Sequence, residues 1–162
     1  MFKKILVKIG LPLIFKSCNK FKVVILVFHK PSPKNFAQAI SYLVEHYSII
    51  ELSKIENYKI SKSSKFPLVI TFDDGHKSNY DLLHIIRKYK IPVTIFLTSG
   101  VIGTNRHFWF IKKNELKSSF NLKKMSNQKR LEDLSVVGFD QLQEYENSQA
   151  LSREQIMEMT PY

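Results

Sequence analysis

Three short runs of apolar and largely β-branched residues alternate with segments of helical periodicity, and this alternation restricts the possible folds more than any other feature. The runs are Lys22–Phe28 (KVVILVF), Leu68–Phe72 (LVITF) and Pro92–Leu97 (PVTIFL). Continuous apolar runs of this length are typical of strands buried on both faces, as in parallel sheets and barrels. Because the segments between them have helical periodicity, the pattern predicts an α/β fold with parallel strands.

The first predicted helix follows the first strand. Ser32 is a good N-cap residue and Pro33 is tolerated at the first helical position. An apolar stripe with helical spacing follows, made of Phe36, Ala39, Ile40, Leu43 and Val44. A short strand is expected around Ile49 and Ile50. The segment Glu51–Lys65 is predicted to be a surface connection that contains a short helix.

Two further helices are announced by capping signals. Ser78 with Asp81 is predicted to open a helix whose apolar face comprises Leu82, Leu83, Ile85, Ile86 and Tyr89. Ser152 with Gln155 forms a capping-box pair that predicts a last helix, which ends near Thr160.

The character of the chain changes after Gly103. The aromatic group His107–Phe110 leads into a stretch rich in Lys, Asn and Ser, with helical pieces predicted near 111–119 and 126–134 and another helix around Gln141–Glu146. Its periodicity is weaker than that of the preceding strands and helices. We therefore interpret this stretch as a helical insertion that follows the third strand.

Composition limits the classes of function. The chain has 162 residues and 44% hydrophobic residues, which suits one globular domain. Its net charge of +11 would attract anionic partners. However, lysines are scattered through every segment, and arginine occurs only at Arg87, Arg106, Arg130 and Arg153. Specific nucleic-acid readers rely on clustered arginine, so we predict solvated lysine-rich faces and no nucleic-acid partner. The single cysteine, Cys18, excludes an intramolecular disulfide.

Residues 1–21 form a separate N-terminal segment. They have the charged start of an export signal, but Lys8 interrupts the apolar run and no small-x-small cleavage site follows. The run is too short to span a bilayer. An amphipathic helix, broken near Pro12 and resting on a membrane surface, fits the alternation of Lys and apolar residues better. A cytoplasmic or peripheral membrane location is therefore expected rather than secretion.

Two adjacent aspartates, Asp73 and Asp74, follow the strand Leu68–Phe72 directly and precede Gly75. Adjacent carboxylates repel unless a cation, a proton or solvent offsets their charge. The carboxyl end of a parallel strand is also where α/β folds place their chemistry. One carboxylate would then be a hard oxygen ligand of a divalent metal and the other a general base. A turn or helix cap built from Asp-Asp-Gly explains the same residues equally well.

The string Thr71–Gly75 (TFDDG) matches the first signature of the NodB-homology polysaccharide deacetylases, carbohydrate esterase family four. Other segments resemble further elements of that family, and the similarity extends from about residue 22 to about residue 160. The segments are Val27–His29, Leu68–Ile70, Ile91–Leu97, Phe108–Phe110 and Ser152–Met159. Together they are far more specific than any single motif.

This resemblance implies a partial, distorted (β/α) barrel over residues 22–162. It places the family's general base on Asp73 and a metal-ligating aspartate on Asp74. A divalent metal, zinc or cobalt, would polarise the acetamide carbonyl of an N-acetylated sugar while a metal-bound water, deprotonated by Asp73, attacks it. The implied partner is a polysaccharide or another N-acetylated glycan, and the product is a free amine.

The sequence departs from the family pattern at its histidines. The family completes its metal site with a His-Ser/Thr-x-x-His signature, which is expected beyond Tyr162. The histidines present are His29, His46, His76, His84 and His107, and no two have the spacing that puts paired ligands on one metal. His76 is predicted as an additional metal ligand, with a loop histidine as the alternative. His29 is predicted to line the substrate pocket, with core packing or a backbone hydrogen bond as the alternative.

Two other functions compete with this one. A phosphatase of the haloacid-dehalogenase kind needs Asp-x-Asp, because alternate residues of a strand point into one site. Asp73 and Asp74 are adjacent, which disfavours that class. A truncated or degenerate relative, catalytically inactive and associated with a glycan or a membrane, is the second candidate, because the histidine pair is absent.

Overall fold

The computed structural model describes residues 22–58, 65–115 and 122–162. The predicted amphipathic segment 1–21 and the end of the predicted helical piece 111–119 lie outside these residues. The chain divides into two compact units. The first comprises Met1–Asp73, Leu82–Phe96 and Tyr162, and the second comprises Asp74–Asp81 and Leu97–Pro161. Within the described ranges, no helix is both long and apolar enough to cross a bilayer.

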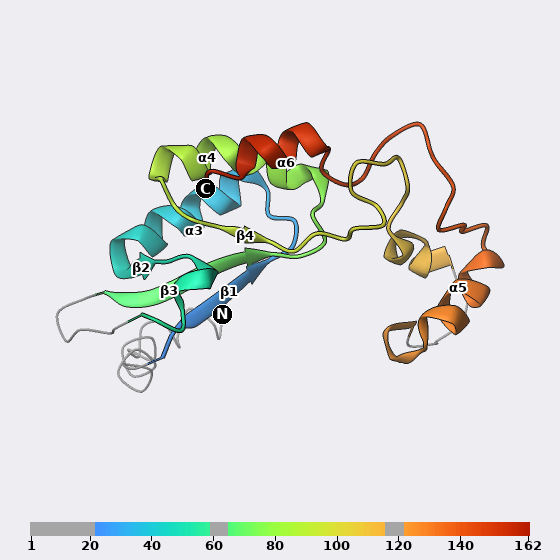
Figure 1. Ribbon diagram of the computed structural model, residues 1–162, viewed down its shortest axis with the longest axis horizontal. Helices are drawn as coiled ribbons and strands as arrows, with labels where there is room; N and C mark the ends of the chain where they lie inside the picture. The colour runs from blue at the N-terminus through green and yellow to red at the C-terminus, as the bar shows by residue number, and fades with distance from the viewer. Residues whose placement is uncertain (1–21, 59–64, 116–121) are drawn as a thin grey trace, which may run out of the picture. The chain divides into compact units, whose positions relative to one another are not determined.

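A parallel sheet of four strands forms the first unit (Figure 1). Its strands are β1 (Val24–Phe28), β2 (Tyr47–Ile49), β3 (Phe66–Phe72) and β4 (Thr94–Ile95). β1 pairs with β3 from Val24↔Leu68 to Phe28↔Phe72. β1 occupies one side of β3. On the other side, β2 pairs with the beginning of β3 and β4 pairs with its end. The predicted α/β fold with parallel strands is confirmed.

Two helices, α3 (Pro33–His46) and α4 (Leu83–Tyr89), lie on the same side of this sheet (Figure 1). As predicted, Ser32 caps α3, and its hydroxyl oxygen accepts a hydrogen bond from the Asn35 N–H at 3.3 Å. The buried residues of α3 are Phe36, Ile40 and Leu43, which belong to the predicted apolar stripe. The predicted short helix in the connection is the 3₁₀ turn η1 (Leu52–Lys54).

Aromatic rings join the sheet to α3. The ring centroid of Phe36 lies 5.3 Å from that of Phe28 and 5.6 Å from that of Phe72, and the two strand rings stack at 5.7 Å. β3 is buried almost throughout, as predicted. The expectation that β1 is buried on both faces is wrong, because Ile25 and Val27 are 52% and 49% exposed. The helices cover the other side of β1, where Phe28 packs.

The start of the second helical segment differs from the prediction. A 3₁₀ turn, η2 (Lys77–Leu82), comes first, and α4 begins only at Leu83, without a side-chain cap. Ser78 does not cap the helix, because its hydroxyl lies 2.9 Å from His76 Nδ1 instead. β4 is shorter than the predicted strand Pro92–Leu97. Its partner β3 ends at Phe72, and the last bond runs from the Phe96 N–H to the Phe72 carbonyl, at 2.8 Å.

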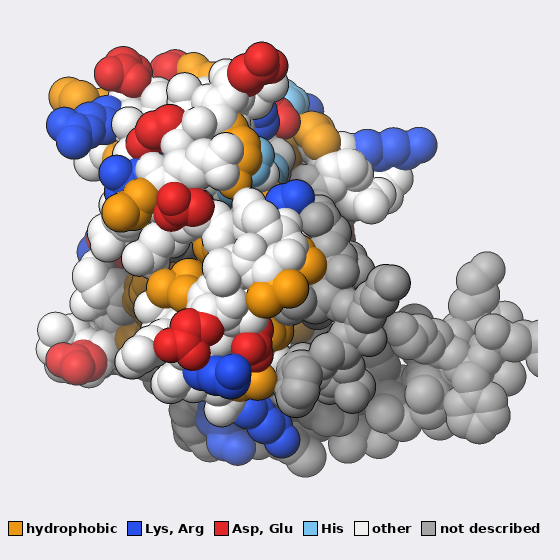
Figure 2. Space-filling view, turned by 90° about the vertical axis from the view of Figure 1, so that its right-hand side faces the viewer, with side chains coloured by type: hydrophobic (Ala, Val, Ile, Leu, Met, Phe, Trp, Pro, Cys, Tyr) orange, Lys and Arg blue, Asp and Glu red, His pale blue; other side chains and the backbone are white. Residues whose placement is uncertain are grey.

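The second unit contains η3 (Trp109–Glu115), η4 (Leu122–Lys124), α5 (Asn127–Ser135) and α6 (Arg153–Met159). The predicted helical piece 126–134 is confirmed as α5. One buried cluster comprises Leu122, Leu134 and Phe139, and another comprises Val101, Phe108 and Ala150. The face shown in Figure 2 carries Lys and Arg side chains interspersed with Asp and Glu.

Two helix predictions in this unit have opposite outcomes. The capping box of α6 is confirmed, since the Ser152 hydroxyl accepts from the Gln155 N–H and the Gln155 side chain accepts from the Ser152 N–H. The predicted helix Gln141–Glu146 is wrong, because this segment forms turns and bends. The Asp140 carboxylate accepts from the Leu142 N–H at 2.8 Å, which builds a local turn in place of a helix.

Candidate catalytic site

Asp73 lies at the carboxyl end of β3, beside His29. The register pairs Phe28 with Phe72, so the next residues, His29 and Asp73, follow at the carboxyl ends of two neighbouring parallel strands. His29 Nδ1 lies 3.9 Å from Asp73 Oδ2, and the two side chains are 72% and 41% exposed. This distance exceeds that of a hydrogen bond, so the pair attracts only when His29 is protonated. Asp73 thus presents a solvent-accessible carboxylate, and the exposure of His29 rules out core packing for its side chain.

Asp74 and Gly75 turn the chain away from the strand. Both have left-handed backbone conformations, with φ of 69° at Asp74 and 68° at Gly75. Positive φ is uncommon for a residue with a side chain, although Asp tolerates it better than most. A Cβ atom on Gly75 would lie 2.7 Å from Leu97 Cδ2 and 3.0 Å from Ile102 Cδ1. Glycine is therefore required here both by backbone conformation and by close packing.

A distant segment of the chain fastens this turn. The Leu151 N–H donates to the Gly75 carbonyl at 2.9 Å, and the Lys77 N–H donates to the Gln149 carbonyl at 2.8 Å. Between these bonds, His76 and Ala150 form an isolated antiparallel bridge. Sequence reasoning missed this segment, because the residues just before α6 carry no local signal of a contact so far along the chain. The turn after the aspartates is thus held by backbone pairing within the second unit.

His76 is held by hydrogen bonds and ring stacking. Its Nδ1 accepts from the Ser78 N–H at 3.2 Å and lies 2.9 Å from the Ser78 hydroxyl. The ring stacks on Phe108 with centroids 6.1 Å apart. A backbone N–H can only donate, so this contact needs an unprotonated Nδ1. Metal binding through Nε2 would instead put the proton on Nδ1, to which the Ser78 N–H cannot donate. Ligation by His76 therefore requires giving up the bond from the Ser78 N–H.

The four predicted site residues lie in pairs. His29 and Asp73 belong to the first unit, and Asp74 and His76 belong to the second. Among the residues that the structure describes, no group of three or more His, Cys, Asp and Glu side chains is placed to hold a metal ion. Catalytic zinc sites ordinarily present three protein ligands and an open position. The described residues therefore do not fit a complete metal centre.

Solved structures similar to this chain include the structure of IcaB from Ammonifex degensii, with 22% identity and a TM-score of 0.52. That match covers 86% of this chain and 48% of the other chain, and it shows a shared fold. A de-N-acetylase from Aggregatibacter actinomycetemcomitans matches with 17% identity, a TM-score of 0.49, and coverage of 86% of this chain and 50% of that one. The chain thus spans about half the length of these structures.

A comparison with curated proteins gave no significant match. A family model described as polysaccharide deacetylase matches residues 61–151. The matched stretch includes β3, both aspartates, the glycine turn and the segment Gln149–Leu151 that fastens it. Because the match extends over more than half of the 162 residues, the chain belongs to the polysaccharide deacetylase family, of the NodB type.

Proposed function

We propose that this chain serves in hydrolysis of the carbon–nitrogen bond of N-acetylated sugars in a polysaccharide, with Asp73 as general base. The observation that carries the proposal is the position of Asp73 in a chain of this family. Its carboxylate is exposed at the end of a buried parallel strand, where water can approach it. A carboxylate there can accept the proton of a water molecule that attacks the acetamide carbonyl.

His29 supports this role as a substrate-facing neighbour of Asp73. It is mostly exposed and lies 3.9 Å from the carboxylate, so it can touch a bound sugar without burying the base. We propose His29 as a substrate-contacting residue, with an effect smaller than that of Asp73.

We further propose Asp74 as a ligand of a divalent metal, zinc or cobalt, with His76 as a second ligand. The adjacent carboxylates favour a cation by their charge. Since the described residues do not provide three ligands, we assign no catalytic step to a metal. The remaining ligands would have to come from residues other than those described. The partial barrel with a helical insertion after β4 is likewise our proposal for the architecture that this sheet begins.

Metal binding is tested by calorimetry with zinc and cobalt chloride on the 162-residue chain and on Asp74→Ala. The exposed Asp81→Ala is a matched control from the same segment. Because two protein ligands hold a metal only weakly, we expect weak binding that Asp74→Ala abolishes and Asp81→Ala preserves. Equal binding by all three proteins would remove Asp74 from the ligand set.

Activity is tested by acetate release from tetra-N-acetylchitotetraose. If Asp73 is the base, Asp73→Asn lowers the rate by about 10²-fold or more, because general base catalysis contributes that much. His29→Ala should raise KM more than it lowers kcat. An unchanged rate in Asp73→Asn would refute the assignment of the base.

A second candidate is an inactive relative, truncated or degenerate, that binds a glycan or rests on a membrane surface. The lack of a three-ligand group among the described residues favours it. It predicts oligosaccharide binding without acetate release at any metal concentration. A cytoplasmic or peripheral membrane location remains our proposal under either candidate, and fractionation of cells that express the chain would test it.

A further inference from the structure

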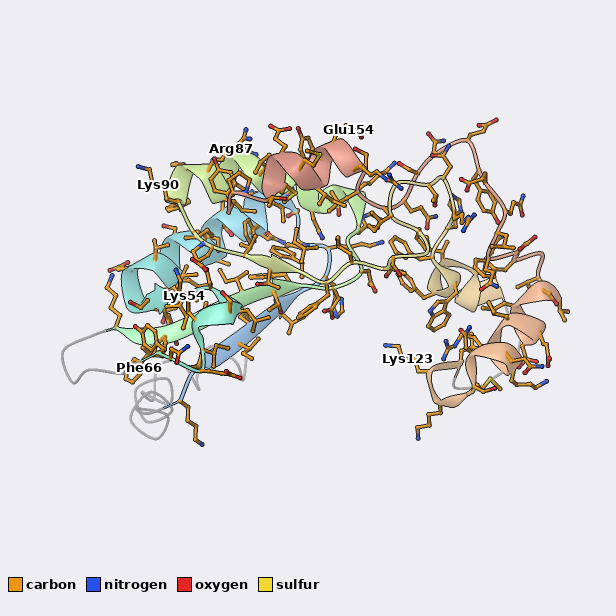
Figure 3. The ribbon with its side chains drawn as sticks, in the orientation of Figure 1. Lys54, Phe66, Arg87, Lys90, Lys123 and Glu154 are labelled. Atoms are coloured by element: carbon orange, nitrogen blue, oxygen red, sulfur yellow. The ribbon has the colours of Figure 1, made fainter. Side chains whose placement is uncertain are left out.

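A cavity of about 400 Å³ lies within the second unit, and neither aspartate of the candidate site lines it. Its lining consists of two stretches of chain, Gly103–Asn105 and Ala150–Glu154, together with Glu144 and Ser148. Glu154, which is labelled in Figure 3, lies in the first turn of α6. A volume of this size lies within the range of sites that hold small molecules.

The walls of this cavity are fixed by contacts of Glu144 and its neighbours. One Glu144 carboxylate oxygen, Oε2, accepts from the Asn105 N–H at 2.6 Å, and the other, Oε1, accepts from Arg106 Nε at 3.1 Å. The Tyr145 N–H donates to the Asn105 carbonyl at 3.1 Å, and the rings of Tyr145 and His107 stack at 3.7 Å. Two stretches far apart in the sequence are thereby held together, so the cavity is preformed.

Arg153 is packed against Gly103 on another wall of the cavity. Gly103 has a φ of +69°, and a Cβ atom there would lie 3.2 Å from both Cγ and Nε of Arg153. The Gly103 N–H also donates to the Leu151 carbonyl at 3.2 Å. The absence of a side chain at Gly103 thus leaves room for the arginine stem, which places a guanidinium group at the cavity.

The lining chemistry suits a neutral, polyhydroxylated ligand. Arg153 supplies fork-shaped donors, while the carboxylates of Glu144 and Glu154 supply acceptors. Glu154 is ionised at neutral pH and therefore an acceptor, and a hydrogen bond from the Ser152 side chain lowers its pKa further. The charged groups offset one another, since Arg106 pairs with Glu144 and Arg153 offsets Glu154, so the lining favours neither an anion nor a cation. No three-ligand metal group exists among the described residues.

We infer that this cavity is a glycan subsite, which binds one sugar unit of the polysaccharide other than the unit that reacts. The choice of ligand rests on the proposed function, whereas the subsite itself goes beyond it. The same stretch, Ala150–Leu151, both lines the cavity and pairs with Gly75 and His76 after the aspartates. A sugar held there would therefore lie close to the turn that follows the candidate base.

The inference is tested by NMR titration of the ¹⁵N-labelled 162-residue chain with tetra-N-acetylchitotetraose. We expect shifts at the amides of Gly103–Asn105 and Ala150–Glu154. Arg153→Ala should weaken binding about tenfold, since a charged hydrogen-bond donor is lost. Asn105→Ala, which keeps the arginine, should weaken it less. Arg87→Ala, which removes an arginine of the first unit, is the matched control and should bind as the unchanged chain does.

The outcomes separate this subsite from the proposed reaction. The amide shifts report binding without turnover, so binding remains measurable even if no acetate is released. Amide shifts that occur only outside the lining stretches, or equal affinity in a folded Arg153→Ala, would overturn the subsite. The lack of any binding at millimolar oligosaccharide would also overturn it, whatever the activity assay shows.

Discussion

Replacing Gly75 with alanine is expected to destabilise the chain through two separable terms. The first is the left-handed backbone, which costs a residue with a side chain about 1–2 kcal/mol. The second is the close approach of Leu97 Cδ2 at 2.7 Å and Ile102 Cδ1 at 3.0 Å to the new Cβ atom. Overpacking of this kind costs about 1–3 kcal/mol. Together the terms predict a loss of about 2–5 kcal/mol in the free energy of unfolding.

Gly138 provides a matched control in the same unit. Its φ is +73°, close to that of Gly75, but a Cβ atom on Gly138 would have no neighbouring atom within 4 Å. Gly138→Ala should therefore show the destabilisation from the left-handed backbone without the destabilisation from close packing. Alanine also lowers the conformational entropy of the unfolded chain, and this stabilising effect is the same in both variants. The excess loss in Gly75→Ala over Gly138→Ala should be about 1–3 kcal/mol.

The assay is urea denaturation followed by the fluorescence of Trp109, the single tryptophan of the chain. Trp109 packs against the second unit's cluster of Leu122, Leu134 and Phe139, so it reports on the unit that contains both glycines. Equal destabilisation by the two variants would refute the packing argument. Adding Leu97→Ala should reduce the excess, because it removes the nearest atom, and an unchanged excess would contradict the assigned contact.

Two other substitutions test the cap and the core. Ser152→Ala should cost about 1 kcal/mol, as lost N-caps do, and should raise the pKa of Glu154 toward its ordinary value, measured by NMR titration of the carboxyl carbon. Folding lowers this pKa, so the Ser152–Glu154 contact contributes stability above the pKa that Glu154 has in the unfolded chain, and this stability is lost as pH falls through the folded pKa. If Glu154 titrates in Ser152→Ala as it does in the unchanged chain, Ser152 is not the cause of the shift. Phe36→Ala should cost about 3–5 kcal/mol, because Phe36 is fully buried against Phe28 and Phe72; a loss below about 1 kcal/mol in urea denaturation would show that the three-ring cluster is not the core.

Local patterns carried most of the information about the elements of the fold. The strands at Val24–Phe28 and Phe66–Phe72, the helix after Ser32 and the capping box at Ser152 follow from periodicity and from short-range hydrogen bonds. These signals are reliable because each interaction involves residues within about one helical turn or one strand. The TFDDG string also identified the family, which the match over residues 61–151 confirms.

Only the tertiary structure decided which local preferences were realised. The helix expected at Gln141–Glu146 does not form, because Asp140 builds a local turn there and the Tyr145 N–H donates to the carbonyl of Asn105, far back in the chain. β1 has the apolar sequence of a doubly buried strand, yet Ile25 and Val27 remain half exposed, since burial depends on which elements pack on a face.

The candidate site likewise combines features that the sequence predicts with features that only the folded structure explains. The sequence alone determined that two aspartates and a glycine end a buried strand, because residue type and order suffice for that statement. The approach of His29 to Asp73 depends on the register of β1 with β3, and the anchoring of the glycine turn depends on Gln149–Leu151. The cavity beside α6 also joins stretches that are distant in the chain. Such contacts carry no local signal, because they arise only when the folded backbone brings separate segments within hydrogen-bonding distance.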